Sequence, residues 1–110
     1  MKNERTDTLI GFIRVELYFR GCRTLKDRRG FLRSLKDRLS NMGFSVAQVG
    51  PPNIIQRAWI AAVCISGTET GASRMLNRAE KLMYNPEWEL ISIDKDIITD
   101  GELSEMEEHY

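Results

Sequence analysis

Apolar residues recur along this sequence with two different periods, and the order of those periods is what most constrains the fold. Alternation of apolar and polar residues indicates a strand with one buried face, whereas apolar residues three or four positions apart indicate a helix. The sequence predicts strands over 9–19, 44–49, 57–66 and 88–97 and helices over 25–42 and 72–83. Right-handed crossovers then place both helices on one face of a four-stranded antiparallel sheet, the α+β ferredoxin-like βαββαβ sandwich.

Turn and cap residues support these boundaries. Thr24 followed by Asp27 is a variant of the capping box that begins a helix, and Gly43 stands where a left-handed cap would end it. Neither a helix nor a ladder can cross Gly50-Pro51-Pro52-Asn53, which predicts a loop before the third strand. Gly30 lies inside the first helix and weakens it by about 1 kcal/mol relative to alanine. This glycine either allows close packing at its position or is only tolerated there.

The length of 110 residues suits one domain with its own core. Cys22 and Cys64 are 42 positions apart with no second pair, so we expect free thiols and no zinc or redox motif. No apolar run approaches the roughly 20 residues of a membrane helix. The polar start favours a cytoplasmic protein. We expect a frayed extension over 1–8, the domain over 9–97 and an acidic tail over 98–110.

The charges cancel overall but are segregated along the chain. Positions 20–38 hold eight basic and two acidic residues, a net charge of +6, whereas positions 94–108 hold seven acidic residues and one lysine, a net charge of −6. This asymmetry fits a face that binds polyanions beside an acidic tail, and it equally fits a solvated basic helix with a solubilising tail. A further hypothesis is that the tail folds over the basic helix and competes with RNA.

The first candidate site is a basic stripe on the first helix. At 100° per residue its members fall within an arc of about 80° beside the apolar stripe, so they can face one surface together. Arginine and lysine in such an array suit successive phosphates. The predicted nucleic-acid-binding residues are Lys26, Arg29, Arg33 and Lys36, joined by Arg74, Arg78 and Lys81 on the outward side of the second helix. The alternative is a solvated helix face.

Arg28 differs from this stripe because its helical phase points it toward the apolar side, near Leu25 and Leu32. We expect a structural role, in which the side chain passes the start of the helix to reach water or pairs with Glu16 or Asp27.

The second candidate site is the sheet face that the helices leave open. The predicted interaction surface consists of Phe12, Arg14 and Tyr18 on the first strand and Leu90 on the last. Aromatic rings with an arginine on such a sheet can stack RNA bases, although Trp59 on the third strand could point either way. Contact with a second copy or another protein explains the same residues, as does partial exposure without a partner.

Enzyme chemistry has little support in the sequence. The single histidine, His109, is the penultimate residue, which leaves no ordered imidazole for a triad or a metal site. Glu16 could pair with Glu89 or Asp94, but the spacing does not single these carboxylates out. The segment Gly67–Gly71 lacks the Gly-Lys-Ser/Thr ending of a nucleotide loop, so we expect Thr68 or Thr70 to cap the second helix. We therefore expect no enzyme activity, cofactor or metal.

Several segments in order resemble the YlxP-like family of small bacterial proteins: Arg14–Leu17, Leu25–Arg29, Leu32–Leu35, Val46–Val49 and Gln56–Ala58. The resemblance covers about residues 10–97 and implies a ferredoxin-like fold. Members tend to be encoded near translation and ribosome-maturation genes, which implies a connection to RNA or the ribosome but no catalytic residues. The polar start and acidic end depart from the usual short core. We expect a non-catalytic protein that binds structured RNA or a ribosomal particle, or alternatively a homodimer or protein-interaction module using the open sheet face.

Overall fold

The computed structural model describes residues 7–99 and 101–102. Its elements are β1 (Leu9–Tyr18), α1 (Leu25–Asn41), β2 (Ser45–Val49), β3 (Arg57–Ser66), α2 (Glu69–Met83) and β4 (Glu89–Thr99). The predicted βαββαβ order is confirmed. The predicted boundaries hold to within one residue for the first three strands and α1, whereas α2 begins three residues earlier and β4 ends two residues later than predicted.

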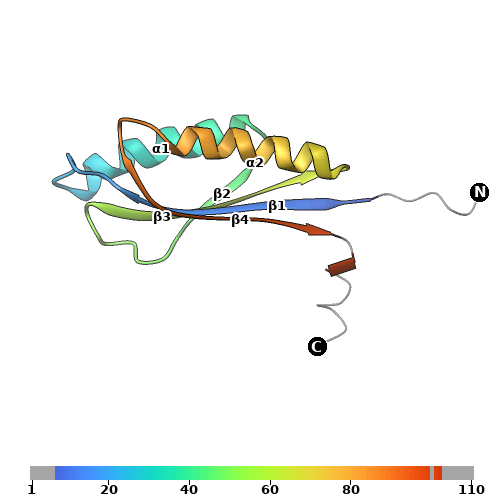
Figure 1. The fold of residues 1–110 in the computed structure, drawn as a ribbon. Helices are drawn as coiled ribbons and strands as arrows, with labels where there is room; N and C mark the ends of the chain where they lie inside the picture. Colours follow the sequence, from blue (N-terminus) through green and yellow to red (C-terminus); the bar gives the residue numbers. More distant parts are fainter. Residues whose placement is uncertain (1–6, 100, 103–110) are drawn as a thin grey trace, which may run out of the picture.

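The four strands form one antiparallel sheet in the order β2-β3-β1-β4. Both helices cover the same face of this sheet, as Figure 1 shows, and no other described element covers the opposite face. The arrangement is the predicted two-layer α+β sandwich of ferredoxin-like topology.

The cap of α1 positions the basic segment that follows it. The Thr24 hydroxyl accepts a hydrogen bond from the backbone N–H of Asp27 at 3.1 Å, and the Asp27 carboxylate accepts from the N–H groups of Arg23 and Thr24. These bonds, with that from Arg23 contributing most, hold the pKa of Asp27 below its usual value. Gly43 ends the helix with φ of 98°, a backbone conformation that other residues rarely adopt.

The cap of α2 is Thr68, one of the two threonines that the sequence offered. Its hydroxyl accepts from the N–H of Gly71 at 3.0 Å, so the helix begins at Glu69.

The core lies between the helices and the covered sheet face. Ile13, Val15 and Leu17 alternate along β1 with residues of the open face and are at most 1% exposed. Phe19 stacks on Phe31 with ring centroids 5.5 Å apart and meets Trp88 edge-on at 6.2 Å. The Trp88 indole N–H donates to the carbonyl of Met83 at 2.9 Å, which ties the end of α2 to the start of β4.

Two expectations about the chain ends lie largely outside the described residues. They are the frayed extension over 1–8, of which residues 1–6 are not described, and the acidic tail, of which residues 100 and 103–110 are not described. The hypothesis that the tail covers the basic helix also concerns residues outside the described ranges, and His109 is one of these residues.

Candidate nucleic-acid interface

The basic stripe of α1 lies on the flank of the helix, next to its buried face. Leu32, Leu35 and Leu39 are buried, whereas Lys26, Arg29 and Arg33 are exposed and Lys36 is half-buried. Within the described ranges, none of the four stripe residues forms a salt bridge. Their charges therefore remain available to an anion in solution.

A shallow hollow of about 230 Å³ runs between this flank and strand β2. It is lined by Arg29, Leu32, Arg33, Lys36, Asp37 and Gln48. Three cations thus border it together with one carboxylate, and Gln48 adds an amide that can both donate and accept hydrogen bonds. The hollow has donors suited to phosphate oxygens, and none of the described residues that line it supplies an aromatic ring that would stack a base.

The three cations of α2 do not join this hollow. Arg74, Arg78 and Lys81 are exposed and lie on the side of α2 opposite its buried residues, such as Leu76 and Ala79. The predicted exposure of these side chains is therefore observed, but the structure separates them from the hollow beside β2.

Arg28 is buried and holds the loop between β2 and β3. Its guanidinium donates hydrogen bonds to the carbonyls of Pro52 at 2.6 Å and Arg57 at 2.7 Å, and also to that of Ile54. The side chain is only 5% exposed. The predicted structural role of Arg28 is therefore supported. The expectation that its side chain reaches water or pairs with a carboxylate is wrong, because its guanidinium donates instead to backbone carbonyls of the loop and of the first residue of β3.

On the open sheet face, the predicted residues of β1 lie together. Phe12, Arg14 and Tyr18 alternate with the buried residues of β1 and so face away from the helices. Trp59, left undecided by the sequence, is opposite Glu16 in the pairing of β1 with β3 and therefore shares this face.

Leu90 is a correction to the predicted interaction surface. It pairs with buried Leu17 and packs against the core, so it belongs to the helix-covered face. The pairing shifts between Glu16, which is opposite Ser92, and Leu17, which is opposite Leu90, so that Ile91 is an extra residue on β4. This bulge inverts the predicted alternation, in which Leu90 shared a face with Ser92.

The arginines of the open face are already engaged by carboxylates. Arg14 contacts Asp94 at 2.9 Å, and Arg57 forms an ion pair with Glu16. Arg14 also lies over the ring of Phe12, with its guanidinium carbon 5.9 Å from the ring centroid. This face is therefore less suited to phosphates than the flank of α1.

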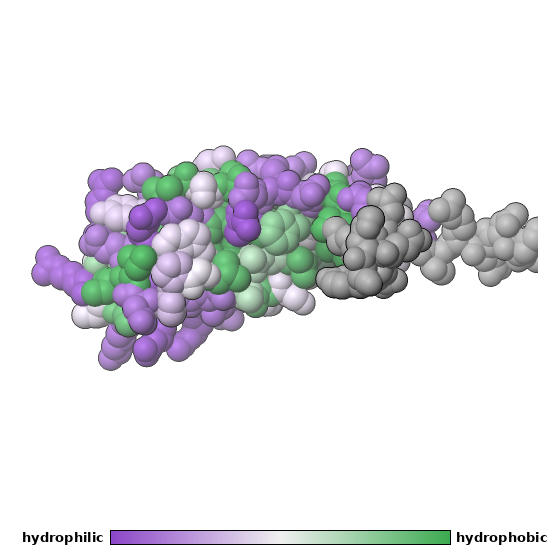
Figure 2. All heavy atoms as spheres, turned by 90° about the horizontal axis from the view of Figure 1, so that it is seen from below, coloured by the Kyte–Doolittle hydropathy of each residue, from purple (hydrophilic) through white to green (hydrophobic). Residues whose placement is uncertain are grey.

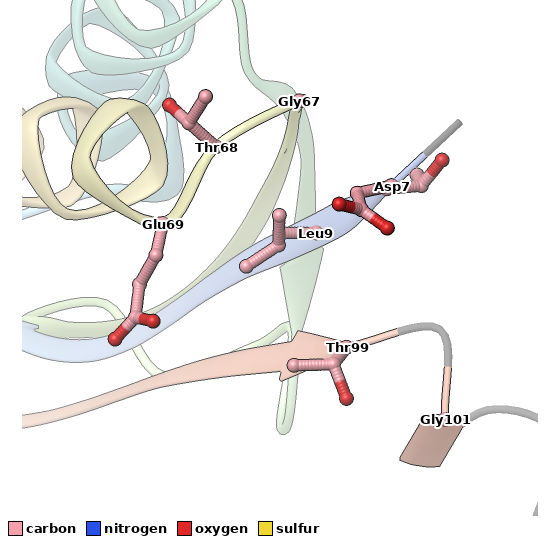
Figure 3. Close-up of a pocket in the computed structure, with 8 residues that line it drawn as sticks. Asp7, Leu9, Gly67, Thr68, Glu69, Thr99 and Gly101 are labelled. Carbon is pink, nitrogen blue, oxygen red and sulfur yellow. The ribbon is translucent and has the colours of Figure 1, made fainter. Parts of the chain in front are cut away.

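Another hollow, of about 460 Å³, opens where β1, β4 and the start of α2 meet. Figure 3 shows Asp7 and Glu69 on different sides of it, with Thr68 next to Glu69. Among the described residues that line this hollow there is no histidine, lysine or cysteine, and two separated carboxylates alone do not make an acid–base or nucleophilic constellation.

Among the residues of known placement, no group of three or more histidine, cysteine, aspartate or glutamate side chains could hold a metal ion. In the same part of the chain, neither helix has the length and apolar character needed to cross a bilayer. Cys22 and Cys64 are free and buried, and burial raises the pKa of both thiols.

The fold and the site define a small ferredoxin-like sandwich with a basic helix flank. The chain belongs to the family described as protein of unknown function (DUF503), which matches residues 10–95. No curated protein matches the chain significantly.

The chain is similar to a number of solved structures. The de novo designed protein Foldit4 aligns with a TM-score of 0.50 at 8% identity, over 84% of this chain and 98% of that one, a likeness of fold alone. A dimeric ferredoxin-like protein from an uncultured marine organism aligns with a TM-score of 0.36 at 15% identity, over 86% of this chain and 88% of that one.

Proposed function

We propose that this protein is a non-catalytic binding protein that docks on the phosphate backbone of structured RNA through the flank of α1. The observation that carries the proposal is that Lys26, Arg29, Arg33 and Lys36 share one helix flank without a salt bridge among the described residues. The resemblance to the YlxP-like family supports a ribosomal particle as the source of that RNA.

The geometry favours contact with a folded backbone over contact with bases. From Lys26 to Lys36 the stripe extends about 15 Å along the helix axis, enough for several phosphates of a double-stranded region. Binding of single strands usually adds aromatic side chains on which bases stack, and the described lining of the hollow between α1 and β2 contains none. We therefore expect a duplex hairpin to bind more tightly than an unstructured strand of equal charge.

The test is filter binding of an RNA hairpin at two or more salt concentrations. Four neutralised phosphates predict a slope of log affinity against log salt of roughly −4. Changing both Arg29→Glu and Arg33→Glu should weaken binding and reduce the slope by about 2.

A matched control is Arg20→Glu with Arg23→Glu, which changes the net charge equally but outside α1. The control should retain the wild-type slope. If the α1 variant and the control behave alike, binding reflects net charge and the proposed site is wrong. If neither binds differently from wild type, the helix flank is only a solvated surface.

The α2 residues Arg74, Arg78 and Lys81 form a separate arm of the same test. Because they do not line the hollow, replacing Arg74 and Arg78 with glutamate should lower the affinity less than the α1 variant does. An equal loss would show that the RNA covers both helices.

The alternative expected from the sequence, self-association or protein contact, uses the open sheet face. The two surfaces are on opposite layers of the sandwich, so the two functions are compatible.

A further inference from the structure

The open sheet face carries a continuous row of apolar side chains. On β3 the residues that alternate with its buried positions are Trp59, Ala61, Val63 and Ile65, and on β1 Phe12 and Ile10 lie opposite Val63 and Ile65. We call these six residues the apolar band. Ile65 is 69% exposed and Val63 is 38% exposed. Figure 2, which views the sheet from the side without helices, shows hydrophobic side chains gathered across the middle of this face with hydrophilic ones around them. A row of this kind on a small protein marks a contact surface.

The arginines beside the apolar band are neutralised within the chain. Arg14 pairs with Asp94, Arg57 pairs with Glu16, and Arg57 also lies over the Trp59 ring, 5.5 Å from its centroid. Asp96 on β4 is opposite Phe12 and forms no ion pair with the described residues, so its carboxylate opposes a nucleic acid at this face. Because Asp96 lies on the edge strand, a second copy of the same paired, apolar face can meet the apolar band along β3.

The sheet edges are poorly suited to joining two copies. β4 is a free edge, but its bulge at Ile91 interrupts the regular pairing and its Lys95 points toward the helix layer, where it pairs with Glu80 of α2. Bulges and inward-pointing charges are devices that prevent edge-to-edge pairing. The other edge, β2, has only five residues. Association between copies is thus directed to the face of the sheet.

The size of the face is sufficient for a stable dimer. β1 and β3 are 10 residues long, and the sheet has four strands. At about 3.4 Å per residue and about 4.8 Å per strand, the three long strands and the five-residue β2 present about 570 Å² per copy. Two such faces together bury about 1,100 Å², above the roughly 1,000 Å² that a biological interface should clear.

We propose that two copies of this chain pack their open sheet faces together in a two-fold symmetric dimer, with the apolar band at its centre. Small Ala61 between bulkier Trp59 and Val63 lets side chains of the two faces interdigitate, as in packed sheets. The helices remain on the outside, so the dimer displays the α1 flank of each copy to solvent.

Sedimentation velocity or light scattering of the full chain over a range of concentrations tests this proposal. The wild-type protein should approach twice the 12.7 kDa of one chain as its concentration rises. Ile65→Glu and Val63→Glu, made separately, should each raise the dissociation constant by about 100-fold or more, because a two-fold interface contains every substitution twice. Circular dichroism establishes that each variant is folded.

The matched control is Ile54→Glu, which places the same charge on a 39% exposed isoleucine in the loop between β2 and β3. It should dimerise like the wild type. A wild-type protein that stays monomeric at high concentration overturns the proposal, and so does a dimer that tolerates both band substitutions. Neither result bears on RNA binding, which is measured with the α1 variants.

Discussion

Replacing Arg28 with methionine tests how the loop between β2 and β3 is held. The wild-type guanidinium donates to the carbonyls of Pro52, Ile54 and Arg57, which belong to a chain segment more than 20 residues further along. Methionine keeps much of the length and apolar volume of the arginine stem but provides no donor. The variant therefore removes the hydrogen bonds while leaving most of the packing in place.

The expected loss of unfolding free energy is about 2 kcal/mol. Three hydrogen bonds at a net value of about 1 kcal/mol each would give a loss of about 3 kcal/mol. Pro52 and Ile54 are exposed, so their carbonyls can turn to water in the variant. The Nε of Arg28 has no hydrogen-bond partner in the described structure, and removing this buried donor returns about 1 kcal/mol.

Urea denaturation followed by circular dichroism measures this difference. The control is Arg29→Met on the next residue of the same helix, which is exposed and should change stability by no more than about 0.5 kcal/mol. Arg28→Lys should fall between wild type and Arg28→Met, because one ammonium cannot replace a guanidinium fork across three carbonyls. If Arg28→Met is as stable as Arg29→Met, the hydrogen bonds to the loop contribute nothing and this reasoning is refuted.

Three further predictions concern stability and reactivity. Gly30→Ala should stabilise the protein by up to about 1 kcal/mol in the same urea assay, because a Cβ at this position of α1 meets nothing within 4 Å, and a destabilised variant would contradict this. The hydrogen bond from Lys95 holds the pKa of Glu80 below its usual 4.5, so the stability it adds is complete above pH 4.5 and is lost as the pH falls through the lowered pKa. Glu80→Gln should therefore be less stable than wild type at neutral pH but not in strong acid, whereas a difference independent of pH in urea titrations would be inconsistent with it. Cys22 and Cys64 should react with a thiol reagent only as fast as the protein opens, since both are buried and their pKa values are raised, and rapid labelling of the native protein would disprove this.

Much of the fold could be predicted because its determinants are local. Thr24 and Gly43 mark the ends of α1 through contacts within a few residues, and the apolar phase of the helix identifies its buried leucines. The same phase predicted that Lys26, Arg29 and Arg33 are exposed. Periodicity is reliable where a segment has a single regular pattern.

The errors arose where distant segments determine the structure. Leu90, Ile91 and Ile93 are all apolar, so either phase of β4 fits the sequence, and the pairing with β1 decides between them by inserting Ile91 as an extra residue. For Arg28, the apolar helical phase indicated burial, but the carbonyls that accept its hydrogen bonds come from a loop whose path depends on packing. A buried arginine near a proline-containing loop is the signal that could have suggested such a contact.

The placement of the candidate site also depended on packing. The sequence put cations on both helices but could not say which flank of α1 would lie beside β2. The structure adds Gln48 to the hollow and leaves Arg74 and Arg78 outside it. The position of Gln48 beside α1 and the separation of the α2 arginines from the hollow depend on how distant elements pack, which no local sequence pattern predicts.

The most direct test of the central claim is a titration of isotope-labelled protein with an RNA hairpin, followed by amide chemical-shift changes. We expect saturable shifts that cluster between Lys26 and Lys36 and around Gln48, weaken with added salt, and leave the β3 residues Trp59 to Ile65 unchanged. Shifts confined to the open sheet face, or no saturable shift at low salt, would contradict RNA binding through the flank of α1.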